Sequence, residues 1–201
     1  ILDAVASGFA AQIHFTEEMM CYPSLRGQEH TAQICFYDAL ASRGYSMDRW
    51  AIDVAEIEDH PGFSPVKVDY SNAINVAGTH KPTAIEGRSL ILNGHVDVVP
   101  TGPLEMWARP PFEPYIDGGW LYGRGGADDG YALFASICAL LALADQGSRR
   151  PRTVVLIEFS EESGSPDLPY WVEHFSAKIG KPDVVICLDS GAGNYEQLWS
   201  T

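Results

Sequence analysis

Carboxylates and one histidine stand where the sequence predicts strand ends or tight turns. The set comprises His95, Asp97, Asp128, Glu161, Glu162 and Asp189. Gathered at one edge of a fold, so many carboxylates would repel one another unless cations lay between them. A mixture of imidazole and carboxylate ligands suits zinc, manganese or cobalt better than magnesium or calcium. These residue types therefore predict one or two bound divalent metal ions, which lower the pKa of water from 15.7 to roughly 7.

The histidine forms a pair with a carboxylate two residues away. His95 and Asp97 lie in the apolar segment 90–99, which reads as a buried strand. Side chains two apart on a strand point to the same face, so we expect the two to project together. A carboxylate beside a metal-binding histidine sets its tautomer and raises its basicity. Alone, the pair is more typical of a strand end that faces water; its placement with the other carboxylates favours the metal.

The elements that must position these residues alternate between helices and strands. Apolar periodicity predicts helices over residues 1–20, 28–40 and 131–144, and a further helix over 168–177. Strands are predicted over residues 50–57, 75–79, 90–99, 153–159 and 183–188. This alternation indicates an α/β fold with a mixed, largely parallel sheet. Sites in such sheets form outside the carboxyl ends of the strands, which is where His95, Glu161 and Asp189 fall.

Composition narrows the class of protein. The 201 residues are 46% hydrophobic and carry a net charge of −14, which indicates one globular domain and opposes nucleic acid or an anionic membrane as partner. No apolar run approaches the ~20 residues of a membrane span, and no signal segment opens the chain. The cysteines form no Cys-x-x-Cys pair, so we expect buried free thiols and a cytoplasmic location. They are Cys21, Cys35, Cys138 and Cys187.

Four motifs occur in a characteristic order. They are Asn-Gly-His-Val-Asp-Val-Val-Pro at 93–100, Leu-Tyr-Gly-Arg-Gly-Gly-Ala-Asp-Asp at 121–129, Glu-Glu-Ser-Gly-Ser at 161–165 and Cys-Leu-Asp-Ser-Gly at 187–191. Over about residues 89–199 the chain resembles the co-catalytic zinc exopeptidases and deacylases of peptidase family M-20. That family includes carnosinase, carboxypeptidase G, aminoacylase, acetylornithine deacetylase and succinyl-diaminopimelate desuccinylase. The resemblance implies a three-layer α/β/α catalytic domain with two divalent metal ions, most simply zinc.

The resemblance also implies a role for each metal-site residue. His95 and Asp189 would bind one metal ion, Glu162 would bind the other, and Asp128 would bridge the two. The family typically has a cis peptide bond after the bridging residue.

Two further roles follow from the same resemblance. Asp97 would orient His95, and Glu161 would act as the general base. The segment from Trp107 to Phe112 is similar to the family's substrate-side loop.

The chain also departs from the family pattern. Gly130 stands where the family commonly has lysine, and no histidine outside the 93–100 motif matches a ligand position. The family continues into a dimerising lid domain and then supplies a last metal-binding histidine. We therefore expect residues 1–201 to be the N-terminal portion of a catalytic domain whose full-length protein could be a homodimer. The portion alone would be inactive.

The resemblance leaves the substrate open. The expected reaction is hydrolysis of an amide or peptide bond in a small peptide or an N-acyl amino acid. Asp189 and the 161–165 motif favour a dipeptidase or aminopeptidase. The alternative within the enzyme class is an N-acyl-amino-acid deacylase of the acetylornithine deacetylase or succinyl-diaminopimelate desuccinylase type. From another class, the chain could be a non-catalytic metal-binding fragment.

Overall fold

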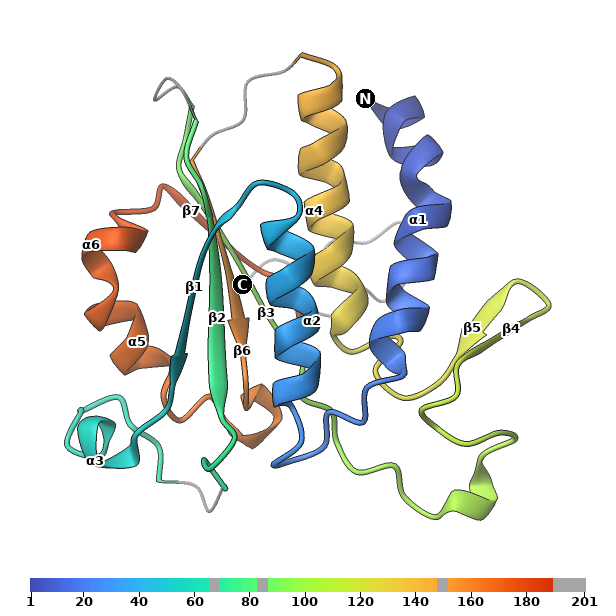
Figure 1. Cartoon of the computed structure of the whole chain (residues 1–201), viewed down its shortest axis with the longest axis horizontal. Coiled ribbons are helices and arrows are strands. Elements are labelled where there is room, and N and C mark those ends of the chain that lie inside the picture. The colour runs from blue at the N-terminus through green and yellow to red at the C-terminus, as the bar shows by residue number, and fades with distance from the viewer. Residues whose placement is uncertain (66–68, 83–86, 148–151, 190–201) are drawn as a thin grey trace.

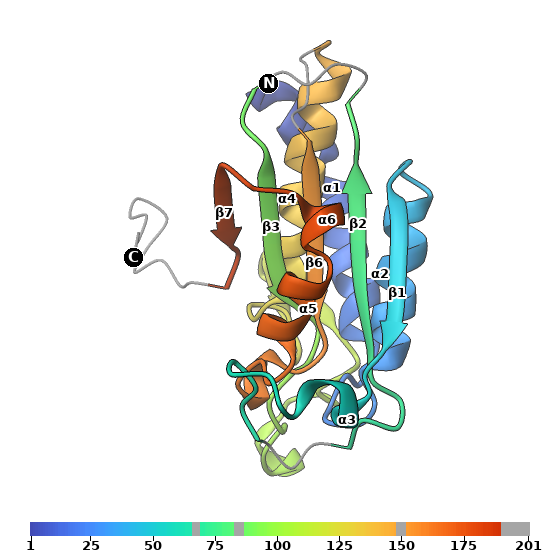
Figure 2. The ribbon, with the colours of Figure 1, turned by 90° about the vertical axis from the view of Figure 1, so that its left-hand side faces the viewer.

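A five-stranded sheet between two layers of helices forms the centre of the molecule (Figures 1 and 2). The structure is a computed structural model that describes residues 1–65, 69–82, 87–147 and 152–189. One layer contains α1 (Leu2–Met20), α2 (His30–Ala41) and α4 (Gly130–Asp145). The other contains α5 (Leu168–His174) and α6 (Ser176–Ile179). Figure 1 shows the two layers on opposite sides of the sheet, which confirms the predicted α/β/α architecture.

The sheet is mixed, with strand order β1-β2-β6-β3-β7. The strands are β1 (Ser46–Ala51), β2 (Ile74–His80), β3 (Leu90–His95), β6 (Thr153–Glu158) and β7 (Val184–Cys187). The strand β3 pairs in parallel with both β6 and β7, whereas β1–β2 and β2–β6 are antiparallel. The parallel register places His95 opposite Glu158, so the carboxyl ends of β3 and β6 meet at one edge.

The core fills the space between the sheet and both helical layers. All residues of β6 are buried, which is typical of a strand covered on both faces. On one side, α4 packs against β3 and α1, and the rings of Phe15 and Phe134 stack at 3.9 Å. On the other side, Trp50 packs against Trp171 and Phe175. Each large apolar side chain buried in this way contributes about 1.5–3 kcal/mol, so the core holds the sheet edge firmly.

Two predicted strands have different bounds in the structure. The strand predicted over 50–57 is wrong beyond Ala51, because β1 ends there and Val54–Ile57 forms the short helix α3. The side chain of Asp53 accepts a hydrogen bond from the backbone N–H of Ala55 at 2.9 Å, which begins a helix there. The strand predicted over 90–99 ends at His95, because its partner β6 ends at Glu158. Asp97 therefore lies beyond the strand rather than on it.

The hairpin of β4 (Tyr115–Asp117) and β5 (Trp120–Tyr122) was not predicted. Gly118 and Gly119 connect the two strands with positive φ angles of 57° and 86°, a conformation that two-residue hairpin turns require. The Gly-Gly pair between short β-prone segments was the available sequence signal. The remaining short elements are the 3-10 helices at Leu104–Met106 and Glu161–Ser163.

The predicted burial of the cysteines is wrong, and one apolar strand is also exposed. The strand β7 is mostly exposed, because it lies at the edge of the described sheet and pairs only with β3 there. The cysteines are free, as predicted, but Cys21 and Cys187 are exposed and the other two are half-buried. Among the described residues, no helix is long and apolar enough to cross a membrane.

Candidate metal centre and active site

His95 lies at the carboxyl end of β3, and its side chain is fully buried. Its Nδ1 atom is 3.2 Å from Oδ1 of Asp97 and 3.0 Å from the backbone carbonyl oxygen of the same residue. Its Nε2 atom faces acidic groups instead, at 3.1 Å from Asp128 Oδ1, 3.6 Å from Asp189 Oδ2 and 3.9 Å from Glu161 Oε2. Asp97 thus holds one ring nitrogen and leaves the other directed at the carboxylates.

Three side chains converge closely enough to hold one metal ion. The ligand atoms of His95, Asp128 and Asp189 lie within 4.8 Å of one another. They come from the end of β3, the glycine-rich turn before α4, and the end of β7. One imidazole and two carboxylates form a ligand set that suits zinc or a similar divalent metal. The peptide bond between Asp128 and Asp129 is cis, as the resemblance implied.

Asp97 also fixes the turn that follows β6. Its two carboxylate oxygens accept hydrogen bonds from the backbone N–H groups of Glu161 and Glu162, both at 3.0 Å. The side chain is only 4% exposed, so these charge-assisted bonds are shielded from water. The predicted contact with His95 is present, but this second role was missed. No local pattern signals it, because the partners are 64 and 65 residues apart.

Two buried groups at this centre, His95 and Asp129, have shifted pKa values. Burial alone would lower the pKa of His95. The hydrogen bond and the charge of Asp97 outweigh burial and raise the pKa to about 10, and the charges of Asp129 and Glu161 act in the same direction. Burial raises the pKa of Asp129 to about 7, although His95 opposes the shift.

The pKa values of the paired glutamates, Glu161 and Glu162, are also raised. Burial raises the pKa of Glu161, His95 opposes this, and Asp189 adds to it. Burial also raises the pKa of Glu162, with a further contribution from the charge of Asp128. A divalent cation among these side chains would offset their mutual repulsion, which is the physical reason that the set fits a metal.

Glu162 is not part of the group whose ligand atoms converge in the described residues. Its assignment to a second metal ion, together with the bridging role of Asp128, therefore stays a prediction. The same holds for Glu161 as general base, although its carboxylate lies near His95.

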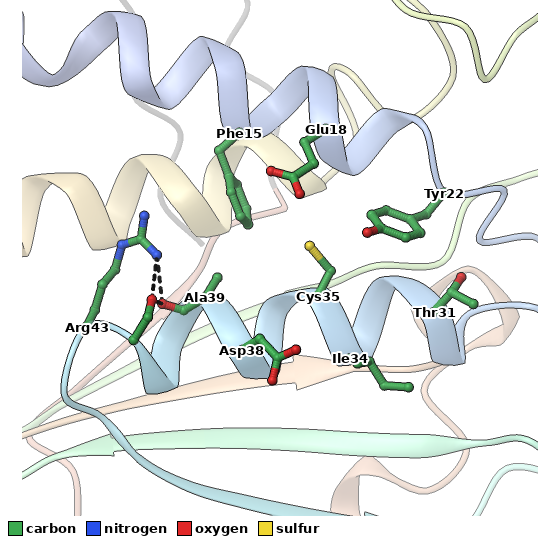
Figure 3. A pocket seen from close by; sticks show the side chains of 10 residues that line it. Phe15, Glu18, Tyr22, Thr31, Ile34, Cys35, Asp38, Ala39 and Arg43 are labelled. Carbon is green, nitrogen blue, oxygen red and sulfur yellow. Dashed lines mark hydrogen bonds between the residues drawn. The ribbon is translucent and has the colours of Figure 1, made fainter.

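Two hollows lie on the surface around these elements. A groove of about 620 Å³ between α1 and α2 is lined by residues that include Glu18, Cys35 and Arg43 (Figure 3). Burial raises the pKa of Cys35, so this thiol is protonated at neutral pH. None of the carboxylates at the metal centre lines this groove. A second hollow, of about 440 Å³, is lined by Asp97 and Glu162 and adjoins the centre.

Comparison with known proteins identifies the family. Residues 91–198 match the family described as "Peptidase family M20/M25/M40". The chain belongs to this family. The M20 family consists of metal-dependent hydrolases, so the chain comes from an enzyme family that uses metal ions, as predicted.

Two curated relatives of the M20 chain are named succinyl-diaminopimelate desuccinylase. The succinyl-diaminopimelate desuccinylase of Methylobacillus flagellatus is 39% identical over 103 residues, which cover 51% of this chain and 27% of that protein. The succinyl-diaminopimelate desuccinylase of Delftia acidovorans is 30% identical over 152 residues, which cover 76% of this chain and 36% of that protein. The chain thus spans about a third of the length of these relatives.

Solved structures support the fold. An M20 family metallo-carboxypeptidase from Sulfolobus solfataricus superposes with a TM-score of 0.70 at 20% identity, covering 90% of this chain and 38% of that one. Human carnosine dipeptidase 1 superposes with a TM-score of 0.69 at 17% identity, covering 92% of this chain and 40% of that one. At these identities the likeness establishes the α/β/α architecture and leaves the substrate open.

Proposed function

We propose that the chain is the N-terminal part of the catalytic domain of a metal-dependent hydrolase that removes the acyl group from an N-acyl amino acid. The observation that carries the proposal is the convergence of His95, Asp128 and Asp189, with Glu161 beside them. The name of the relatives at 30–40% identity, succinyl-diaminopimelate desuccinylase, supports a deacylase. The short span relative to those proteins supports a longer full-length chain that includes further catalytic segments.

This proposal reverses the preference drawn from the sequence. Asp189 and the 161–165 motif favoured a dipeptidase or aminopeptidase, but the curated relatives support the deacylase better. Dipeptidases and carboxypeptidases resemble the chain in structure, at 20% identity or less. A dipeptidase is the second candidate, because Asp189 and the 161–165 motif favour it.

The residues present assign positions to the metal. His95, Asp128 and Asp189 would hold one ion, and we propose that Glu162 holds a second with Asp128 shared. When bound, divalent metal ions lower the pKa of water and polarise the carbonyl oxygen of an amide.

The chain's own groups then handle the proton. Water adds its oxygen to the acyl carbon, the C–N bond breaks, and the products are a carboxylate and a protonated amine, which receives both protons of the water. Glu161 would accept the proton that the water loses and deliver it to the departing nitrogen. Burial raises the pKa of Glu161, which brings it nearer to the pKa that a base working at neutral pH requires. Asp97 accepts a hydrogen bond from the backbone N–H of Glu161 and so fixes the position of the backbone that carries the Glu161 side chain.

The test uses the full-length product of the gene, loaded with zinc, and a panel of N-succinyl amino acids, N-acetyl amino acids and dipeptides. A deacylase hydrolyses the first or second class and leaves the dipeptides intact. Glu161→Gln should lower kcat by roughly 10²–10⁴-fold while the zinc content stays unchanged. Glu56→Gln, at an exposed site on α3, is the matched control and should keep full activity.

Two results would count against the proposal. A full-length protein that binds two zinc ions and hydrolyses nothing in the panel would support the non-catalytic alternative. Full activity of Glu161→Gln would show that another group is the base.

A further inference from the structure

The hollow beside the metal centre has a composite lining. Its volume is about 440 Å³, and its walls come from the loop after α1, the segment after β3 and the turn after β6. Aliphatic groups form much of the lining: Leu25, Val98, Val99 and Pro100. Asp97 and Glu162 bring the charge of the metal centre to the same hollow.

Arg26 is the one cation in the described lining of this hollow. Its Nη2 atom donates a hydrogen bond to the hydroxyl of Ser163 at 2.6 Å, which ties the guanidinium to the turn that carries both glutamates. A guanidinium has five N–H donors, so most of them remain for another acceptor. The side chain is exposed and lines a hollow that also contains Asp97 and Glu162, whose charges would otherwise repel a free anion.

We propose that Arg26 determines specificity by binding a carboxylate of the substrate. The inference rests on the proposed deacylase function and narrows it to anionic N-acyl amino acids. Arginine pairs with carboxylates in a planar, bidentate geometry, which gives both affinity and orientation. The aliphatic wall of Leu25, Val98 and Val99 provides contact for a short methylene chain that ends in that carboxylate. The carboxylate belongs either to the acyl group or to the amino acid, and the substrates below distinguish the two.

The experiment uses the zinc-loaded full-length protein and three related substrates. They are an N-succinyl amino acid, its N-butanoyl analogue without the acyl carboxylate, and the N-succinyl amino acid amide. Arg26→Gln should raise KM for the N-succinyl substrate roughly 10–100-fold and change kcat little, because a charge-assisted hydrogen bond is lost. Arg26→Lys should recover part of the affinity. The control Arg43→Gln removes a guanidinium from the α1–α2 groove of Figure 3 and should leave all three substrates unaffected.

The substrates report which carboxylate is bound. If Arg26→Gln spares only the N-butanoyl analogue, Arg26 binds the acyl carboxylate. If it spares only the amide, Arg26 binds the carboxylate of the amino acid. An equal rise in KM for all three substrates would mean that Arg26 only anchors Ser163. An unchanged KM for all three would mean that Arg26 does not contact the substrate. Either result overturns the inference while the deacylase function stands. A parent protein that hydrolyses none of the substrates overturns both.

Discussion

Glu29, which is not one of the proposed metal ligands, offers a sharp test of the electrostatics. It precedes α2 and is 1% exposed. Its Oε1 atom accepts a hydrogen bond from the backbone N–H of Gly27 at 2.9 Å, whereas Oε2 has no hydrogen-bond partner within the described part of the chain. Burial raises the pKa of this carboxyl from 4.5 to about 7, against the opposing backbone hydrogen bonds.

The sign and size of the effect follow from proton linkage. The folded state holds the Glu29 proton more tightly than the unfolded state, so this stabilisation is complete below pH 4.5 and is lost as the pH rises to about 7. One pKa unit corresponds to 1.36 kcal/mol, so the total loss is about 3 kcal/mol. Glu29→Gln keeps an acceptor for Gly27 and cannot ionise. We expect this substitution to change the free energy of unfolding little at pH 4.5 and to raise it by about 3 kcal/mol at pH 8.

Urea unfolding of the metal-free protein from pH 4.5 to pH 8 measures the difference between variant and parent. Thermal unfolding at pH 8 should show a rise of about 6–12 °C, because 1 kcal/mol shifts Tm by ≈ 2–4 °C at this size. Glu56→Gln, which removes a carboxylate at an exposed position, is the matched control. A variant whose stability runs parallel to the parent across this range would refute the assigned pKa.

Three further predictions concern the metal centre and its support. Asp97→Ala should weaken zinc binding roughly 10–100-fold in calorimetric titration, because His95 loses its partner. It should also lower the free energy of unfolding in urea by about 3–5 kcal/mol, because two backbone N–H groups lose their acceptor. Unchanged zinc affinity would contradict the role of Asp97. Gly94→Ala should lower the free energy of unfolding in urea by about 1–3 kcal/mol, since the added Cβ would lie 2.5 Å from Asp129 Oδ2. Gly8→Ala is the control and should not destabilise the protein, because an added Cβ there has nothing within 4 Å. Removal of zinc with a chelator should lower Tm, and zinc at 100 times its Kd should raise the free energy of unfolding by about 2.7 kcal/mol. A Tm that does not change with zinc concentration would contradict a zinc site in the folded state.

Long periodic segments were predicted correctly because their burial depends on local pattern. The helix α4 and the strand β6 contain apolar residues almost throughout, which strongly favours their burial. The short elements were missed, since a helix of four residues such as α3 depends on the cap at Asp53. The edge position of β7 was also invisible, because its residues are as apolar as those of a central strand.

The sequence by itself determined the family, through four motifs in order, and it determined which residue types could hold a metal. Only the tertiary structure decided which atoms meet. Parallel pairing of β3 with β6 and β7 brings three strand ends to one edge and places Asp189 near Nε2 of His95, while the turn before α4 brings Asp128 to the same atom. Contacts such as that between Arg26 and Ser163 join residues 137 positions apart. Such contacts depend on strand register and loop path, which are global properties of the chain, so local patterns do not contain them.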